Sequence, residues 1–285
     1  MPVPSRALPP STAAIVISDV DGTLLDDRGW AARPEELRRL LGARPLVLAS
    51  SRTVRELVVL QRTLGITGPV IAENGAVIAL DSPSTDGSTR PRRIGRRTVH
   101  VRRLGESTAV VRTLLDQAAV DADVRLCTAD QVDPARRARR GIVGHGAHAR
   151  AIGAREASVL LEPVDVAGAT ARRWHEALAA RGLVLSSGGN WTCAVSGADK
   201  GRATHVVRGV LADGLSTPVT TVGLGNDAND APLLAAVDRP IAVRRPDGRV
   251  HPSLLAVAHV MVCQRPGIGG AVDALRAQFG LEVAA

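Results

Sequence analysis

The 285-residue sequence predicts an α/β protein, built on a doubly wound parallel sheet into which a second, smaller α/β unit is inserted. Two observations support this fold class. Short apolar runs rich in Val, Ile and Leu recur between turn residues, which is typical of parallel strands buried on both faces. Segments with helical periodicity alternate with these runs, as they do in βαβ units.

The main sheet is predicted to come from two stretches of the chain, residues 13–85 and 196–285, which together form a Rossmann-like core. The expected strands are 13–20, 44–50, 68–80, 216–225, 239–244 and 258–263, and the expected helices are 33–42, 53–65, 200–214 and 229–238. Residues 1–12 are rich in proline and lack the apolar stretch of a signal peptide, so we expect a flexible leader there.

Residues 86–195 are predicted to form the inserted unit, an α/β cap domain with a small sheet of its own. A loop-like segment rich in Ser, Pro, Gly and Thr, residues 81–93, marks the change of pattern. The expected strands of this part are 97–104, 123–128, 157–166, 183–187 and 190–195, and the expected helices are 106–119 and 168–182.

The composition excludes several classes of protein. Hydrophobic residues make up 45% of the chain, which is normal for a globular protein, and no apolar run approaches the length of a membrane span. The three cysteines, Cys127, Cys193 and Cys263, form no C-x-x-C pair, which argues against a disulfide framework or a zinc site. We therefore expect a cytoplasmic protein with no membrane partner.

The net charge of +8 favours anionic partners. Arginines cluster in residues 89–103 and 135–140, but no aromatic residues are interleaved with them and no helix-turn-helix or zinc-finger spacing surrounds them. We interpret the clusters as solvated faces or loops. A funnel toward a small anionic substrate is the alternative, and nucleic-acid binding is the least favoured, so we expect no nucleic-acid partner.

Polar residues follow several predicted strands, and ligands of open α/β sheets bind beyond the carboxyl ends of the strands. Asp19 and Asp21 end the first strand, Ser50 and Ser51 end the second, and residues 225–230 end the strand 216–225. Two carboxylates this close favour a bound cation, and oxygen ligands suit Mg²⁺. The alternative is local: an acidic capping turn in the first case and a helix-capping serine in the second.

Lys200 is the only lysine of the chain, and every other basic residue among the 36 is arginine. A surface charge that was retained by chance is one interpretation. The other is functional, because a compact ammonium fits between two anions where the broad guanidinium does not. In either case we expect Lys200 to lie at the surface of a cleft.

Together these segments resemble the haloacid dehalogenase superfamily, whose pattern is D-x-D-G-T, then Ser or Thr after the second strand, then Lys, then G-D-x-x-N-D. The resemblance implies a Mg²⁺-dependent phosphatase that hydrolyses a phosphomonoester through an aspartyl-phosphate. It implies that Asp19 is the nucleophile and Asp21 the general acid and base. The implied phosphate-binding residues are Ser50, Ser51, Lys200 and Asn229, and the implied metal ligands are Asp19, Asp21, Asn226, Asp227 and Asp230.

Other segments are similar to the mannosyl-3-phosphoglycerate phosphatase group, namely SSRTVREL (50–57), IAENGAVI (71–78), REASVLLEP (155–163), SGGNW (187–191) and ADKGRA (198–203). This resemblance implies an anionic sugar-phosphate substrate, split into mannosylglycerate and phosphate. The implied substrate contacts are Arg52, Glu73, Asn74, Arg155, Glu156, Ser158 and Gly189. A plain hairpin turn at Asn74-Gly75 and a surface pair at Arg155-Glu156 are the alternatives.

Three positions depart from that pattern. Arg52 stands where many members have lysine, Asn190 where many have arginine, and Asn226 where most have aspartate. The first two leave glucosyl-3-phosphoglycerate or another sugar phosphate as alternative substrates. Because Asn226 is neutral, a catalytically weak phosphate-binding protein is also an alternative. Either Asn226 or Asp227 completes the metal site, and we favour Asn226.

Overall fold

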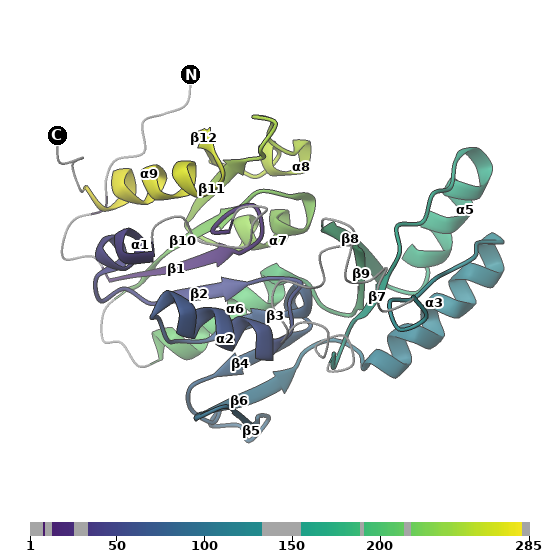
Figure 1. Ribbon diagram of the computed structural model, residues 1–285, viewed down its shortest axis with the longest axis horizontal. Coiled ribbons are helices and arrows are strands. Elements are labelled where there is room, and N and C mark those ends of the chain that lie inside the picture. Colours follow the sequence, from purple (N-terminus) through teal and green to yellow (C-terminus); the bar gives the residue numbers. More distant parts are fainter. Residues whose placement is uncertain are drawn as a thin grey trace.

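The computed structural model describes residue 8 and residues 13–25, 34–132, 155–188, 191–213 and 218–280. A large sheet carries helices on both faces, and a smaller sheet with two helices lies beside it (Figure 1). This is the predicted fold class, a mostly parallel α/β sheet with an inserted cap. Among the described residues, no helix combines the length and the apolar character that are needed to cross a membrane.

The large sheet has nine strands in the order β12-β11-β10-β1-β2-β3-β4-β6-β5. The pairings from β12 to β3 are parallel, and those from β3 to β5 are antiparallel. The strands are β1 Ala14–Asp19, β2 Leu46–Ala49, β3 Val70–Ala72, β4 Val77–Leu80, β5 Arg90–Ile94, β6 Arg97–Arg103, β10 Thr220–Gly225, β11 Arg239–Arg244 and β12 Met261–Pro266.

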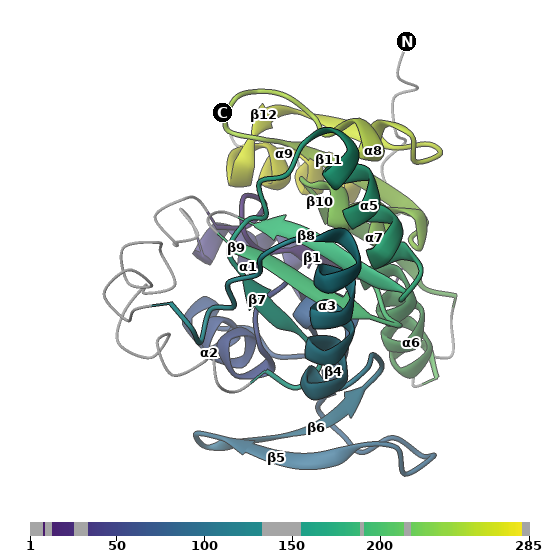
Figure 2. The same cartoon turned by 90° about the vertical axis from the view of Figure 1, so that its right-hand side faces the viewer.

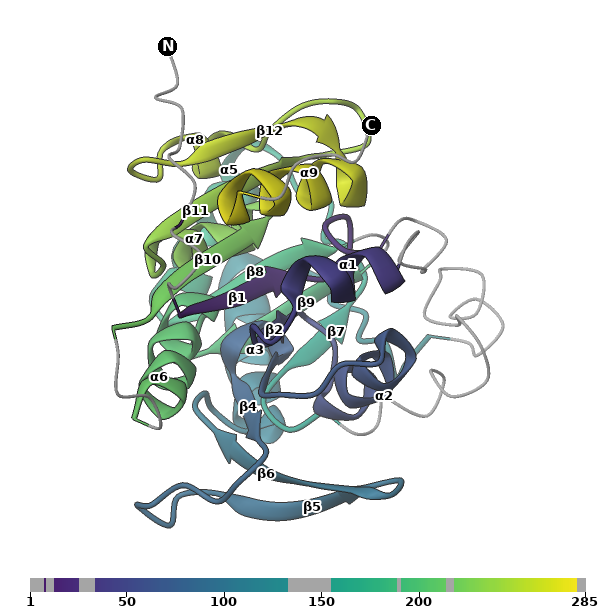
Figure 3. The ribbon, with the colours of Figure 1, turned by 90° about the vertical axis from the view of Figure 1, so that its left-hand side faces the viewer.

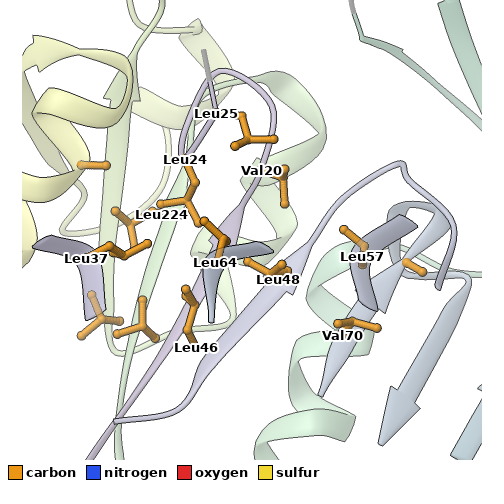
Figure 4. Close-up of a cluster of buried hydrophobic side chains, with 14 of the residues drawn as sticks. Val20, Leu24, Leu25, Leu37, Leu46, Leu48, Leu57, Leu64, Val70 and Leu224 are labelled. Carbon is orange, nitrogen blue, oxygen red and sulfur yellow. The ribbon is translucent and has the colours of Figure 1, made fainter. Parts of the chain in front are cut away.

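Helices cover both faces of this sheet (Figure 3). One face packs against α1 Pro34–Leu41, α2 Val54–Leu64 and α9 Gly267–Phe279, and the other against α6 Lys200–Ala212, α7 Ala231–Ala235 and α8 Pro252–Leu255. In β1, Val16 belongs to the first core and its neighbours Ile15 and Ile17 to the second, so the strand is buried on both sides. Figure 4 shows leucines of α1 and α2 over β1, β2 and β10.

The predicted strand 68–80 is in fact two strands, β3 and β4, which pair antiparallel around residues 73–75. The physical reason is local. Glu73, Asn74 and Gly75 all have positive φ, at 50°, 55° and 94°, and three left-handed residues in a row reverse the chain. The strand predicted at 123–128 is also wrong, because only Thr128 of that segment forms a bridge, to Leu161.

The cap has a three-stranded antiparallel sheet in the order β7-β9-β8, built from β7 Val159–Leu161, β8 Leu183–Gly188 and β9 Trp191–Ser196. Two helices, α3 Thr108–Ala122 and α5 Gly168–Ala179, cover its outer face (Figure 2). Cys193 and Val195 of β9 belong instead to the same core cluster as Ala72 and Ala76 of the main body. The inner face of the cap sheet therefore rests on the main domain.

The start of the cap differs from the predicted residue 86. Strands β5 and β6 pair onto β4 and extend the large sheet, so the cap begins after β6. The chain crosses between the two parts at two adjoining points, where the Glu106 N–H donates to the Ser196 carbonyl at 3.0 Å. Apart from Leu8, the predicted leader lies outside the described residues, as do the Arg-rich loop 135–140, Gly189 and Asn190.

Candidate active site

The residues predicted from strand ends meet at one edge of the large sheet, because β10, β1 and β2 are parallel neighbours. Asp19 pairs in register with Ala49, and Ser18 with Leu224. The segments that follow these strands therefore start side by side. They supply Asp21 after β1, Ser50 after β2, and Asn226 after β10.

Lys200 lies between two carboxylates at this edge. Its Nζ donates to Oδ1 of Asp19 at 2.7 Å and to Oδ1 of Asp230 at 2.6 Å. The lysine side chain is 0% exposed, so the expectation of a cleft-surface charge is wrong. The reason is that Lys200 is the first residue of α6 and lies under the loop that carries Asp230. A thin stem with a compact charge fits this buried position, as the functional interpretation of the lone lysine requires.

Two carboxylates sharing one ammonium leave excess negative charge in a buried place. Burial, and then the charge of Asp230, raise the pKa of Asp19 to about 7, although Lys200 acts in the opposite direction. Burial alone would lower the pKa of Lys200, but the attraction of Asp19 and Asp230 outweighs it and raises that pKa. Lys200 is thus a fixed cation, and Asp19 is the group that an additional cation would hold ionised.

Asp230 also shapes the loop in which it lies. Its second oxygen accepts hydrogen bonds from the backbone N–H groups of Asn226 at 2.9 Å and Asp227 at 3.1 Å. Since the first oxygen is bound to Lys200, both oxygens of this fully buried carboxylate are used within the protein. The hydrogen bonds of the Asp230 carboxylate therefore favour a role in fixing Lys200 and the 226–230 loop over direct contact with a metal.

Asp21 lies nearer to solvent and is held by Arg52. The guanidinium donates through Nε to Oδ2 at 2.9 Å and through a terminal nitrogen to Oδ1 at 2.6 Å, a bidentate pair. Ser50 Oγ, which is buried, contacts the same carboxylate at 3.4 Å and accepts from the Arg52 N–H at 3.3 Å. Ser51 is half-buried in the same loop, before α2.

The 226–230 loop directs its two candidate metal ligands differently. The Asn226 side chain lies against the first acidic turn, because a Cβ placed on Gly22 would meet its Nδ2 at 2.1 Å. Asp227 instead accepts from the Ala228 N–H at 2.6 Å and pairs with Arg245 at 2.5 Å. The geometry therefore favours Asn226 over Asp227 as the residue that faces Asp19 and Asp21.

The predicted substrate contacts lie where the cap meets the main domain. Glu73 is fully buried, and its carboxylate accepts from the Ser158 hydroxyl at 2.5 Å and from the N–H groups of Glu156 and Ala157. Arg155 donates to the carbonyl of Ser51 at 2.9 Å. The Glu156 side chain is part of an ion pair with Arg92, at 2.6 Å.

Asn74 joins a different pair of residues. Its Nδ2 donates to Ser186 Oγ of the cap at 2.5 Å, and its Oδ1 accepts from Asn229 at 3.1 Å. Asn229, predicted to bind phosphate, thus connects through Asn74 to the cap.

The residues at the sheet edge suit a hard divalent cation. Asp19 offers a carboxylate oxygen that accepts the Thr23 hydroxyl at 3.1 Å, and Asn226 offers an amide oxygen. The excess negative charge around Lys200 supplies the attraction. Among the described residues, no group of three or more His, Cys, Asp and Glu side chains is placed to hold a metal.

Three residues that form hydrogen bonds at this site were not identified from the sequence. Thr23 stands inside the first acidic turn, and that motif was the available signal for its hydrogen bond to Asp19. No local sequence pattern indicates the other two contacts. Ser186 is distant in sequence from its partner Asn74, and Arg245 meets Asp227 only because the folded loop orients that carboxylate.

Comparisons with known proteins found one matching family model and several similar structures. The model of the haloacid dehalogenase-like hydrolase family matches residues 16–91. A phosphatase of this superfamily from Bacteroides thetaiotaomicron has a similar structure, with a TM-score of 0.62 and 19% identity over 98% of this chain and 100% of that one. A subclass IIB sugar phosphatase has a TM-score of 0.60 and 15% identity, over 94% and 100% of the two chains.

The sucrose-phosphatase from Synechocystis, solved with sucrose and phosphate, has a TM-score of 0.56 and 16% identity over 94% of this chain and 98% of that one. At such identities these likenesses concern the fold. The matched residues 16–91 contain Asp19, Asp21, Ser50 and the 73–75 turn. The protein therefore has the fold of haloacid dehalogenase-like hydrolases and matches their family model over the first acidic motif and the serine loop.

Proposed function

We propose that this protein is a phosphatase that acts on a sugar phosphate by way of an aspartyl-phosphate. The observation that carries this proposal is Lys200, buried between Asp19 and Asp230 beside the acidic turn of β1. Phosphoryl transfer requires little from a protein beyond positioning and charge stabilisation, and this edge of the sheet offers both. The match to hydrolases over residues 16–91 supports the same reaction class.

In the first step, a carboxylate oxygen of Asp19 attacks phosphorus, and the bond from phosphorus to the ester oxygen breaks. Lys200 stays charged and lies 2.7 Å from Asp19, so it reduces the repulsion between the carboxylate and the phosphate. Asp21 donates a proton to the departing alkoxide oxygen. For that to happen Arg52 has to release one of the two oxygens that it holds.

In the second step, Asp21 accepts a proton from water, and the resulting hydroxide attacks the phosphorus of the aspartyl-phosphate. The bond between phosphorus and Asp19 breaks, which releases phosphate and restores the carboxylate. In this proposal Ser50, buried at the end of β2, and Lys200 contact phosphate oxygens. Asn229 orients the phosphate from the opposite loop.

The residues fit Mg²⁺ as the cofactor. Asp19, the backbone carbonyl of Asp21 and the side chain of Asn226 would hold it. Bound there, it would supply positive charge that keeps Asp19 ionised and offsets the charge of the phosphate.

For the substrate, we propose a glycosyl-phosphoglycerate, with mannosyl-3-phosphoglycerate first and glucosyl-3-phosphoglycerate or another sugar phosphate as the alternative. Such a molecule carries a carboxylate beside its phosphate ester. Arg155 of the cap reaches the loop of Ser51, and its buried Nε has no hydrogen-bond partner among the described residues. Arg52, whose Nε and one terminal nitrogen bind Asp21, lies on the same loop, and the two guanidinium groups together would attract a second anion.

The test is phosphate release, with and without Mg²⁺, from p-nitrophenyl phosphate and from a panel that contains both glycosyl-phosphoglycerates and several hexose phosphates. We expect Mg²⁺-dependent turnover and a preference for substrates with the additional carboxylate. Tight binding of phosphate without turnover of any ester would show that the protein is a phosphate-binding protein and not a phosphatase. Equal turnover of all panel members would remove the glycosyl-phosphoglycerate from the proposal.

A further inference from the structure

We propose that residues 73–75, which we call the 73–75 turn, position the cap on the catalytic residues, and that Glu73 and Asn74 act as positioning residues rather than as substrate contacts. This inference rests on the proposed function, because it assigns the turn a role in the same reaction. The observation behind it is that one three-residue turn contacts the serine loop, the start of α6, the 226–230 loop and the cap.

The carboxylate of Glu73 binds the cap directly. It accepts from Ser158 Oγ at 2.5 Å, from the Ala157 N–H at 3.1 Å and from the Glu156 N–H at 3.0 Å. Glu73 is 0% exposed, so a substrate cannot reach it without displacing the cap. A buried carboxylate is stable only while its donors remain in place, and here the cap segment 156–158 supplies all the donors named above.

The backbone of the turn holds the serine loop. The Glu73 N–H donates to the Arg52 carbonyl at 2.9 Å, and the Asn74 N–H donates to the Ser50 carbonyl at 3.0 Å. The cap returns to this loop through Arg155, which donates to the Ser51 carbonyl at 2.9 Å and to Ser158 Oγ at 2.9 Å. A shift of the cap at Ser158 would therefore also displace the loop that carries Ser50.

Asn74 connects the cap to the opposite side of the site. Because its amide bridges Ser186 of β8 and Asn229, the orientation of Asn229 depends on where β8 lies. Gly75 lies so close to the start of α6 that an added Cβ would stand 2.0 Å from the Asp199 carbonyl oxygen. The turn is thus fixed against the helix that begins with Lys200.

The backbone conformation agrees with this role. Glu73 and Asn74 both lie in the left-handed region, which costs energy for residues with a side chain, above all for glutamate. Such a conformation persists where the surroundings enforce it. Here the surroundings are the cap and the catalytic loops themselves.

The main test compares Glu73→Gln with the wild type in two assays. Small-angle X-ray scattering without substrate measures the radius of gyration, which should rise in the variant as the cap separates. Steady-state kinetics compares mannosyl-3-phosphoglycerate and glucose 6-phosphate with p-nitrophenyl phosphate. We expect kcat/KM for the sugar phosphates to fall by about 10²-fold, because these substrates lose the cap contacts as well as the alignment of Ser50 and Asn229, and kcat/KM for p-nitrophenyl phosphate to fall by a clearly smaller factor, about tenfold.

Matched variants sharpen the result. Arg92→Gln removes the partly exposed ion pair between Arg92 and Glu156, also between core and cap, and should change neither assay because exposed pairs contribute little. Ser158→Ala removes one donor of Glu73 and should reproduce part of the loss. The double variant of Glu73 and Ser158 should be no worse than Glu73→Gln alone, because both changes remove one shared contact. If Glu73→Gln fails to fold, Ser158→Ala provides both measurements.

An unchanged radius of gyration, or parallel losses on the sugar phosphates and on p-nitrophenyl phosphate, would overturn the inference. Failure of the proposed function has a different signature: the wild type then releases phosphate from none of the esters, while the scattering measurement still reports whether Glu73 holds the cap.

Discussion

Replacement of Lys200 by arginine is the most informative single change, because the chain uses arginine at every other basic position. The wild-type Nζ lies 2.7 Å from Asp19 and 2.6 Å from Asp230, in a side chain that is 0% exposed. The charge is conserved in the variant. What changes is the volume and the shape of the cation, so the substitution separates the need for charge from the need for a compact ammonium.

Two effects set the expected size of the change. A guanidinium is larger than the space filled by the lysine head, and overpacking a buried site costs about 1–3 kcal/mol. The guanidinium also moves the positive charge away from the point where Asp19 and the phosphate meet. Loss of one pre-organised donor at a reacting centre lowers kcat by a factor on the order of 10²–10³.

The assay is phosphate release from p-nitrophenyl phosphate at saturating Mg²⁺, together with thermal unfolding. We expect kcat to fall by that factor and the Tm to fall by about 2–10 °C, the shift that corresponds to the overpacking term. Arg202→Lys is the matched control on the same helix, because Arg202 is exposed and bonded to the Gly197 carbonyl. A Lys200→Arg protein with wild-type kcat would show that the position needs only a positive charge.

Four further results are expected. Asp19→Asn should abolish phosphate release, since an amide accepts no phosphoryl group, and more than a few per cent of residual kcat would contradict its role. The raised pKa of Asp19, about 7 in the folded protein, means that its contribution to stability is complete below about pH 4 and is lost as the pH rises to about 7. The Tm of metal-free wild type minus that of Asp19→Asn should therefore fall between pH 4.5 and 7.5, and a flat difference would exclude the shift. Asn226→Asp should lower the Mg²⁺ concentration for half activity and Asp227→Ala should leave it unchanged; the reverse pattern would make Asp227 the ligand. Replacing residues 107–195 by a short linker should leave weak hydrolysis of p-nitrophenyl phosphate and abolish the preference among sugar phosphates. If the order of preference among the substrates stays the same, the cap does not determine specificity.

The position of the catalytic edge could be predicted because it depends on local sequence. Asp19, Ser50 and Asn226 each follow an apolar run, and parallel neighbouring strands necessarily bring such residues to one edge of the sheet. The closeness of Lys200 to Asp19 was implied by resemblance alone, since 181 residues separate them.

Other parts could not be predicted, for physical reasons that differ. The contacts of Glu73 with Ser158 and of Asn74 with Ser186 depend on how the cap docks, across 85 and 112 residues. Nothing in the local pattern around residues 73–75 distinguishes a turn that binds substrate from one that binds the cap. Strand β6 was expected, as 97–104, but was assigned to the cap, and most of β5 falls within the segment 81–93 that was interpreted as a loop. The arginines and the proline of β5 give no apolar alternation that would indicate its pairing with β6.

The exposed arginines of β5 have a consequence for how copies of this protein behave in concentrated solution. Within the described residues, β5 and β12 are the outermost strands of the large sheet, and an outer strand offers unpaired backbone groups to which another chain can add. Strand β5 reads RPRRI, with Pro91 removing one N–H donor and arginines placing like charges along the edge, and β12 ends in Arg265 and Pro266. Repulsion between two such edges opposes sheet extension from molecule to molecule. The arginine-rich segment can thus protect the protein against aggregation without any nucleic acid or other polyanion as its partner.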